Sequence, residues 1–192
     1  MSYDISLCDP VTKEPLWSEK PHMMRGGTYA IGGTQELWLN ITYNYAHYYY
    51  EATDGDPRFA HEEVSCYYAD GTKGPMETQY GIRGIYGKTG AESIPMLRDM
   101  IQRITEKYKP NGRWISTKRE KRRVLDEFGV EHKDPYQLII SGRPYTTEDY
   151  EIEVSEGPNK DYWEPTAANA IGPLYSLIAM AELRPDGVWD GD

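Results

Sequence analysis

The sequence predicts an α+β fold with three core helices, a small N-terminal antiparallel sheet and an inserted charged α/β segment. Three observations support this prediction. Short alternating segments occur near the N-terminus, apolar residues recur at helical spacing in three later segments, and the charge pattern changes between residues 109 and 160. A chain of 192 residues can bury a sizeable core. We therefore expect residues 1–108 and 161–192 to form the core domain and residues 109–160 to form an inserted subdomain.

The first elements are expected to be strands. Tyr3–Leu7 alternates between apolar and polar residues and is followed by the turn-forming pair Asp9-Pro10. Leu16-Trp17 and residues 28–31 are further short segments of strand character. Together these segments predict a small antiparallel meander.

The tyrosine-rich segment from residue 37 to residue 49 fits two structures. Ile41, Tyr43 and Tyr45 alternate with polar residues, as they would in a strand. The preceding Gly32-Gly33-Thr34, however, supplies a turn and a helix N-cap. Helical spacing also covers a longer stretch, because five residues fall on one helix face: Leu37, Ile41, Tyr45, Tyr48 and Ala52. We therefore expect a helix over residues 34–51.

Two later helices are marked by periodicity and by end signals. Thr89 and Glu92 form a capping-box pattern at the start of the expected helix 91–107. The expected helix 166–182 stops before Pro185-Asp186-Gly187, a strong terminator. The core should contain residues from all three helices: Leu37, Ile41, Tyr45, Ile94, Leu97, Ile101, Leu174 and Ile178.

The insert is expected to contain one helix and two strands. Residues 117–128 predict a short helix closed by Gly129, and residues 136–140 and 150–154 predict a strand pair. Residues 109–133 hold eight basic and four acidic residues, whereas residues 134–160 hold two and six. This pattern is typical of a solvated helix followed by acidic loops. Alternatively, the basic half faces the acidic body or a partner.

The overall charge and composition exclude several classes of protein. A net charge of −10 argues against direct nucleic-acid binding, because a phosphate-binding surface needs surplus Lys and Arg. No apolar run approaches the roughly 20 residues that cross a bilayer, and the first residues do not resemble a signal peptide. Cys8 and Cys66 are too few for a disulfide framework. We expect a cytosolic protein with reduced thiols and no membrane association.

No catalytic or metal-binding motif stands out. His47 and Glu51 have a spacing that a metal pair could use, but a site needs three or four ligands. The chain has no Walker A pattern, no dinucleotide-binding fingerprint and no nucleophile elbow. The sequence therefore predicts no metal and no cofactor, and an enzyme would have no assignable reaction class.

Two glycine-rich turns ahead of predicted helices are the best candidates for a ligand site. Helix N-termini expose unpaired N–H groups and a partial positive charge, and glycine lets an anion approach the backbone. Two such ends facing each other would hold a phosphate or nucleotide, with tyrosines stacking on a base. The simpler alternative is that each turn only caps its helix. The predicted ligand-binding residues are Arg25, Gly26, Gly27, Gly33, Thr34, Tyr43, Asn44, Arg83, Thr89 and Gly90.

Several motifs together carry a resemblance to a known family. They are HMMRGGTYAIGGT, WLNITYNY, GIRGIYGKTGAESIP, YWEPTAANA and RPDGVWDGD. In this order they resemble a family of small, uncharacterised proteins from phages and prophages of Gram-positive gut bacteria. The resemblance covers about residues 1–50, 80–104 and 161–192, and family members look shorter across residues 109–160. It implies no activity, but it implies a setting, which is a phage accessory protein in the host cytoplasm.

This setting favours a function by binding, directed against host defence. One route is sequestration of a nucleotide-type ligand at the glycine-rich turns. The other is an acidic surface that occupies a basic face of a defence protein. The alternative is a small phage enzyme that acts on a nucleotide or nucleic acid, and a structural or packaging-accessory protein comes third. The sequence does not indicate an oligomeric state.

Overall fold

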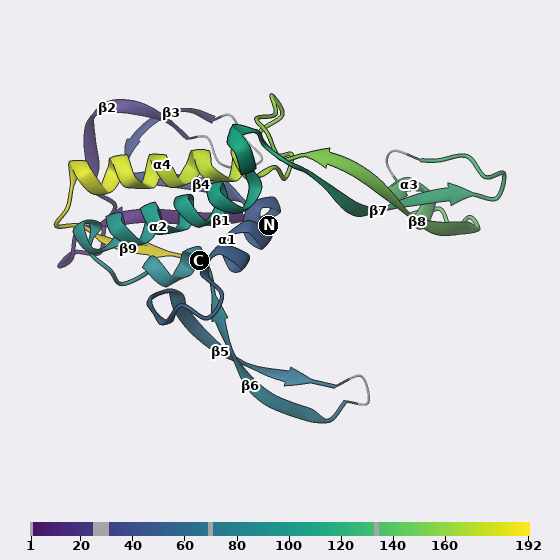
Figure 1. Ribbon diagram of the computed structural model, residues 1–192, viewed down its shortest axis with the longest axis horizontal. Coiled ribbons are helices and arrows are strands. Elements are labelled where there is room, and N and C mark those ends of the chain that lie inside the picture. The colour runs from purple at the N-terminus through teal and green to yellow at the C-terminus, as the bar shows by residue number, and fades with distance from the viewer. Residues whose placement is uncertain (1, 25–30, 69–70, 133–134) are drawn as a thin grey trace. The chain divides into compact units, whose positions relative to one another are not determined.

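The structure is a computed structural model that describes residues 2–24, 31–68, 71–132 and 135–192. It is a mixed α+β fold with small antiparallel sheets (Figure 1). The chain divides into two compact units. Unit 1 contains Met1–Arg113 and Gly157–Asp192, and unit 2 contains Trp114–Glu156. Among the residues that the structure describes, no helix has the length and apolar character needed to cross a membrane.

The central sheet of unit 1 has the strand order β4-β1-β9 and is antiparallel throughout. Its middle strand, β1 (Ser2–Cys8), confirms the strand expected at Tyr3–Leu7. The alternation in the sequence is an alternation in burial, since Tyr3, Ile5 and Leu7 are fully buried. β4 (Trp38–Thr42) and β9 (Val188–Gly191) flank it. The short strand β9 was not predicted.

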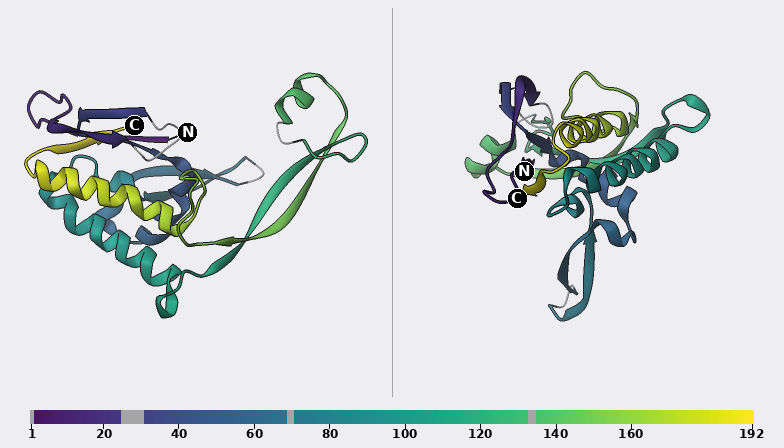
Figure 2. Two further views of the ribbon diagram at one scale, coloured as in Figure 1. Left: turned by 90° about the horizontal axis from the view of Figure 1, so that it is seen from above. Right: turned by 90° about the vertical axis from the view of Figure 1, so that its left-hand side faces the viewer.

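Two long helices lie side by side and cover one face of this sheet (Figures 1 and 2). They are α2 (Gly90–Tyr108) and α4 (Ala167–Leu183), which confirm the helices expected at 91–107 and 166–182. The predicted capping box between Thr89 and Glu92 is present. Ile94 is only half-buried, but the other expected core residues are buried: Leu37, Ile41, Tyr45, Leu97, Ile101, Leu174 and Ile178.

The helix expected over residues 34–51 is wrong in its first half. That stretch contains the end of β3 (Ile31–Glu36) and all of β4, followed by a 3-10 turn, η1 (Tyr43–Tyr45), and then α1 (Ala46–Thr53). The apolar residues fit the spacing of a helix and that of a strand. The strand forms because β1 pairs with the whole length of β4 and supplies hydrogen bonds that a helix would not make. Side chains at positions 37, 39 and 41 are consequently buried.

The expected N-terminal meander is also wrong in its pairing. β2 (Trp17–Met24) pairs with β3 in a separate two-stranded sheet, whereas β1 pairs with β4 and β9. Residues 28–30 of the expected third strand lie outside the described residues. Leu16 still hydrogen-bonds to the neighbouring strands, since its N–H donates to the Leu7 carbonyl and its carbonyl accepts from Leu37.

A hairpin follows α1. A short turn, η2 (Pro57–Phe59), leads into β5 (Ala60–Tyr67) and β6 (Lys73–Tyr80), and η3 (Ile82–Ile85) returns the chain to α2. The hairpin extends away from the helices (Figure 1). Its described far end exposes Tyr67, Tyr68 and Met76.

Unit 2 is a long two-stranded ribbon with a short helix. β7 (Ser116–Asp126) pairs with β8 (Tyr145–Ser155) over its whole length, and α3 (Pro135–Ile140) lies in the connection. The helix expected at 117–128 is therefore wrong, as is the strand expected at 136–140, whereas the strand at 150–154 is confirmed within β8. The ladder of cross-strand partners overrides the local helical signal.

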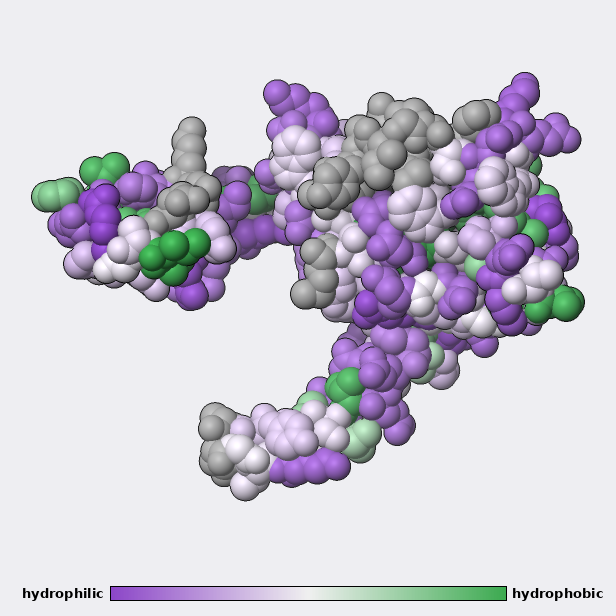
Figure 3. Space-filling model, turned by 180° about the vertical axis from the view of Figure 1, so that it is seen from behind, coloured by the Kyte–Doolittle hydropathy of each residue, from purple (hydrophilic) through white to green (hydrophobic). Residues whose placement is uncertain are grey.

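The charges of unit 2 are arranged across the ribbon. Arg122 forms an ion pair with Asp149, and Arg123 forms one with Glu148, each at 2.7 Å. The basic half of the segment thus faces its acidic half. Apolar side chains gather instead at the end that carries α3 (Figure 3). Those exposed there are Phe128, Val130, Tyr136, Ile139, Ile140 and Tyr145.

Candidate functional site

The ten predicted site residues are distributed over five places in the chain. Arg25, Gly26 and Gly27 lie outside the described residues. Gly33 and Thr34 belong to β3, and Tyr43 and Asn44 belong to η1. Arg83 lies in η3, and Thr89 and Gly90 lie at the start of α2.

The predicted anion site at Thr34 loses its physical basis, because no helix begins there. Thr34 is a strand residue that pairs with His22, and its hydroxyl accepts the Glu36 N–H at 3.1 Å. A strand has no cluster of unpaired N–H groups and only a small net dipole.

The N–H groups at the start of α2 are already in use. Thr89 N–H donates to the Glu92 carboxylate at 2.8 Å, and Glu92 N–H donates back to the Thr89 hydroxyl at 3.2 Å. Gly90 N–H donates to the Gly187 carbonyl at 2.8 Å, and Ala91 N–H donates to the Pro185 carbonyl at 3.0 Å. The glycine is needed for this approach, because a Cβ at Gly90 would lie 2.7 Å from the Arg184 carbonyl oxygen. This turn therefore caps α2, as the simpler alternative held.

Arg83 lies in a different setting, a polar cavity of about 750 Å³. Its Nε donates to the backbone oxygen of Asp192 at 2.8 Å. Its guanidinium carbon lies 5.2 Å from the ring centre of Tyr3, a cation–π distance. The cavity is lined by residues of η3, β5 and the C-terminal segment: Ala60, His61, Glu62, Arg83, Gly84, Tyr86, Lys88, Gly191 and Asp192.

Two cations of this cavity have no carboxylate side chain paired with them. Within the described residues, neither Arg83 nor Lys88 forms a side-chain ion pair, unlike arginines 58, 98, 122, 123 and 184 elsewhere. Burial alone would lower the pKa of Arg83, but the adjacent hydroxyls of Tyr86, Tyr3 and Tyr43 and the nearby Asp192 raise it. Arg83 therefore stays charged beside the cavity and can still bind an anion.

A chain of tyrosine hydroxyls backs the guanidinium. Tyr3 donates to the Tyr50 hydroxyl at 3.3 Å, and the hydroxyls of Tyr43 and Tyr50 also form a hydrogen bond. Burial raises the pKa of Tyr3, and the bond to Tyr50 raises the pKa of Tyr43. The hydroxyls of Tyr3 and Tyr43 therefore stay neutral, and Tyr3 forms the wall against which Arg83 packs. The tyrosines between residues 43 and 50 thus contribute side chains to the core and to the hydrogen-bonded cluster around Tyr3, behind Arg83.

Two glycines of the GIRGIY segment set the position of Arg83. Gly81 has φ = 148°, a conformation that favours glycine, and a Cβ there would lie 2.9 Å from the Tyr50 ring. At Gly84 a Cβ would lie 2.4 Å from Cα of Phe59, so the backbones of η2 and η3 touch. Because neither position carries a Cβ, η3 packs closely against Tyr50 and η2. This packing places Arg83 between Tyr3 and the cavity.

Other groups around the cavity add hydrogen-bonding capacity. Nδ1 of His61 lies 3.3 Å from the Phe59 carbonyl oxygen, so a proton on Nδ1 leaves Nε2 as an acceptor. Burial, and then the charge of Asp192, raises the pKa of Tyr86 to about 12. Tyr86 therefore remains a neutral donor. Glu62 contributes the opposing charge at the rim.

The structure thus brings together part of the predicted set and adds residues that were missed. Arg83 and Tyr43 lie on either side of Tyr3, whose ring centre is 5.2 Å from the Arg83 guanidinium carbon and 5.0 Å from the Tyr43 ring centre. Asn44 instead donates to the Trp163 carbonyl at 2.8 Å. Lys88 was visible in the sequence beside the second turn. The other cavity residues, His61, Tyr86 and Asp192, carry no local signal, since only the fold places them next to Arg83.

The described residues include no group of three His, Cys, Asp or Glu side chains arranged to hold a metal ion. Compared with protein-family models, with curated proteins and with solved structures, the chain matches none of them.

Proposed function

We propose that this protein acts by binding and captures a nucleotide-type anion in the Arg83 cavity. The observation that carries this proposal is the pair of cations, Arg83 and Lys88, that face a polar cavity without a carboxylate side chain paired to either one. A guanidinium can donate two parallel hydrogen bonds to a phosphate, and lysine adds a point charge. The cavity volume of about 750 Å³ lies within the range of about 300–1,000 Å³ that is usual for small-molecule sites.

The neighbouring rings support a ligand that carries a base as well as a phosphate. Tyr86 and His61 line the same cavity and offer both flat faces and hydrogen-bonding groups. Glu62 and Asp192 disfavour a ligand of high negative charge, so a mono- or diphosphate fits better than a triphosphate. The acidic residues also offer acceptors for ribose hydroxyls or base amino groups.

The biological setting comes from the family resemblance and is part of the proposal. A phage accessory protein in the host cytoplasm would antagonise host defence by sequestering a nucleotide signal. Binding alone is sufficient for that role, because a sequestered signal no longer reaches its receptor.

The test begins with the protein as purified from cells. Small molecules released by denaturation are identified by mass spectrometry, and a panel of mono-, di- and cyclic nucleotides is then screened by thermal shift. A ligand present at 100 times its Kd stabilises the folded protein by about 2.7 kcal/mol. Arg83→Ala should abolish this stabilisation, and Arg83→Lys should restore part of it, because lysine lacks the planar fork.

The matched control is Arg98→Ala, which removes an exposed arginine paired with Glu182 at 3.1 Å on the helix surface. This variant should bind as the parent does. If no nucleotide stabilises the parent, or if Arg83→Ala binds normally, the cavity is not the site. Chromatography of the nucleotides after incubation separates capture from turnover, and turnover would favour the enzyme alternative.

A second candidate function is the occupation of a basic face on a defence protein. It is favoured by the net charge of −10. It is also favoured by the exposed apolar side chains at the α3 end of unit 2, among them Phe128 at 78% and Tyr136 at 64% exposure. A complex of this kind should weaken at high salt, and Phe128→Ser should weaken it at every salt concentration. A pull-down from host lysate at two salt concentrations measures both effects.

A further inference from the structure

Tyr45 differs from the other tyrosines between residues 43 and 50. Tyr48 donates to the Pro165 carbonyl at 2.7 Å, Tyr49 donates to the Ala170 carbonyl at 2.9 Å, and Tyr43 and Tyr50 bond to each other. Tyr45 is just as buried, with 1% of its surface exposed, yet its hydroxyl has no hydrogen-bond partner within the described part of the chain. A hydroxyl in such a buried side chain needs an acceptor, and where the chain supplies none, water or a ligand has to supply it.

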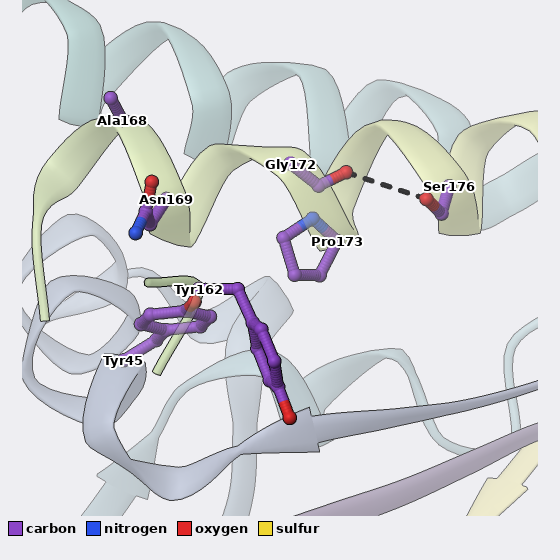
Figure 4. Close-up of a pocket in the computed structure, with 7 residues that line it drawn as sticks. All are labelled: Tyr45, Tyr162, Ala168, Asn169, Gly172, Pro173 and Ser176. Atoms are coloured by element: carbon purple, nitrogen blue, oxygen red, sulfur yellow. Dashed lines mark hydrogen bonds between the residues drawn. The ribbon is translucent and has the colours of Figure 1, made fainter. Parts of the chain in front are cut away.

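The Tyr45 hydroxyl reaches a pocket. The described residues contain no fully enclosed side-chain N or O atom that lacks a partner, so this unpaired hydroxyl must touch accessible space. That space is a pocket of about 290 Å³ beside α4 (Figure 4). It is lined by Tyr45, Tyr162, Ala168, Asn169, Gly172, Pro173 and Ser176.

The walls of this pocket have the shape for one flat ring. The rings of Tyr45 and Tyr162 lie next to each other and face α4, which contributes Gly172 and Pro173 (Figure 4). A Cβ at Gly172 would have no atom within 4 Å, so this position leaves open space along the helix. An apolar cavity of about 150 Å³ is already large enough to bind benzene. A single substituted ring therefore fits the larger Tyr45 pocket.

The pocket also specifies the charge of its occupant. No Lys, Arg, Asp or Glu side chain lines it. The Asn169 amide is committed elsewhere, since its Nδ2 donates to the Asp161 carbonyl at 3.1 Å and its Oδ1 accepts the Asn159 N–H at 3.1 Å. Burial raises the pKa of Tyr45, so its hydroxyl remains a neutral donor. The free polar groups of the pocket are thus hydroxyls, which pair with a neutral ligand.

We propose that the Tyr45 pocket is a second binding site, separate from the Arg83 cavity, for a small neutral aromatic molecule that accepts a hydrogen bond from the Tyr45 hydroxyl. The ring packs between Tyr45, Tyr162 and Pro173, and the acceptor satisfies the unpaired O–H. This inference does not depend on the nucleotide proposal, because no residue lines both the Tyr45 pocket and the Arg83 cavity.

The test uses benzamide, a neutral ring with a carbonyl acceptor, and toluene, a ring of similar width without one. Amide resonances of the full-length protein are followed by NMR during titration with each compound. Benzamide should produce saturable shifts at Tyr45 and Gly172, and toluene should bind more weakly. Tyr45→Phe should raise the Kd for benzamide about three- to tenfold and leave toluene binding unchanged.

Three further variants keep the outcome interpretable. Gly172→Leu fills the open space while remaining compatible with a helix, and it should abolish binding of both compounds. Tyr175→Phe removes the hydroxyl of an exposed tyrosine on the same helix and should bind as the parent does. Arg83→Ala should also bind benzamide normally, which separates this site from the nucleotide site. The proposal is overturned if benzamide gives no saturable shift, if Gly172→Leu binds it as the parent does, or if Tyr45→Phe has no effect.

Discussion

The indole N–H of Trp189 donates a hydrogen bond to the hydroxyl of Ser93 at 2.7 Å, inside the core. Trp189 is the largest fully buried side chain of the described residues, and Ser93 is fully buried in the first turn of α2. The Ser93 hydroxyl in turn donates to the Gly90 carbonyl at 2.8 Å. This relay joins β9 to the start of α2, beside the cap formed by Thr89 and Glu92.

Replacing Ser93 with Ala should destabilise the protein by about 1–3 kcal/mol, because the buried indole N–H is left without an acceptor. The free energy of unfolding is measured by denaturant titration. Trp189→Phe removes the donor, and the double variant should lose less than the sum of the two single variants. Strict additivity in this cycle would show that the hydrogen bond contributes nothing.

Replacing Leu97 with Ala should lower the free energy of unfolding by about 2–5 kcal/mol, since Leu97 is fully buried on the core-facing side of α2. Ile94→Ala, one turn earlier and only half-buried, is the matched control and should cost less. Both values come from denaturant melts of the intact chain. A loss below about half a kcal/mol for Leu97 would mean that this helix face is exposed.

The parts of the fold that could be predicted are those whose signals are local. α2 and α4 have end signals and a long apolar period, and both were placed within a few residues. β4 and β7 show helical spacing as well as strand spacing, because their apolar and charged residues fit both periods over a short span. In each case the deciding fact is a strand far along the chain, β1 for β4 and β8 for β7.

The candidate site, too, could be predicted only where its signals are local in the sequence. Arg83 lines the cavity, whereas Tyr43 lies behind it, with its ring centre 5.0 Å from that of Tyr3, against which Arg83 packs. The helix N-terminus expected at Thr34 is absent, because Thr34 lies in β3. At Thr89 the N–H groups exist, but Glu92 and the carbonyls near Pro185 already accept their hydrogen bonds. Only tertiary structure reveals that kind of competition.

The turn of unit 2 should respond to acid through Asp126. The hydrogen bond from His132, followed by the backbone N–H groups of Val130 and Phe128, lowers the pKa of Asp126 from 3.8 to about 2. The folded turn therefore binds a proton less readily than the unfolded chain. Its stabilisation is complete above about pH 4 and is lost as the pH falls toward 2.

This response can be followed by the amide shifts of Phe128 and Val130 during an acid titration. Both should change with a midpoint near pH 2 in the parent. In Asp126→Asn the transition should vanish, since the amide keeps an acceptor but does not ionise. A midpoint near 4 in the parent would contradict the hydrogen-bonded turn.

Deleting residues 114–156 should leave unit 1 with a cooperative unfolding transition. The two ends of unit 2 adjoin each other, because Ser116 pairs with Ser155 and Glu156 N–H donates to the Ile115 carbonyl at 2.9 Å. A short Gly/Ser bridge can therefore connect Arg113 to Gly157. Calorimetry of the shortened chain measures the transition. A molten remainder would show that unit 2 is needed for the core of unit 1.

The strand order β4-β1-β9 determines when the central sheet can be completed during translation. Ile5 pairs with Gly191, so β1 keeps one unpaired edge until the residues of β9, more than 180 positions later, have left the ribosome. The ribbon of β7 and β8 needs only neighbouring segments and can close while that edge is still open. During translation the charged ribbon is therefore assembled before the body of unit 1 is finished, and the arrival of Trp189 completes the core.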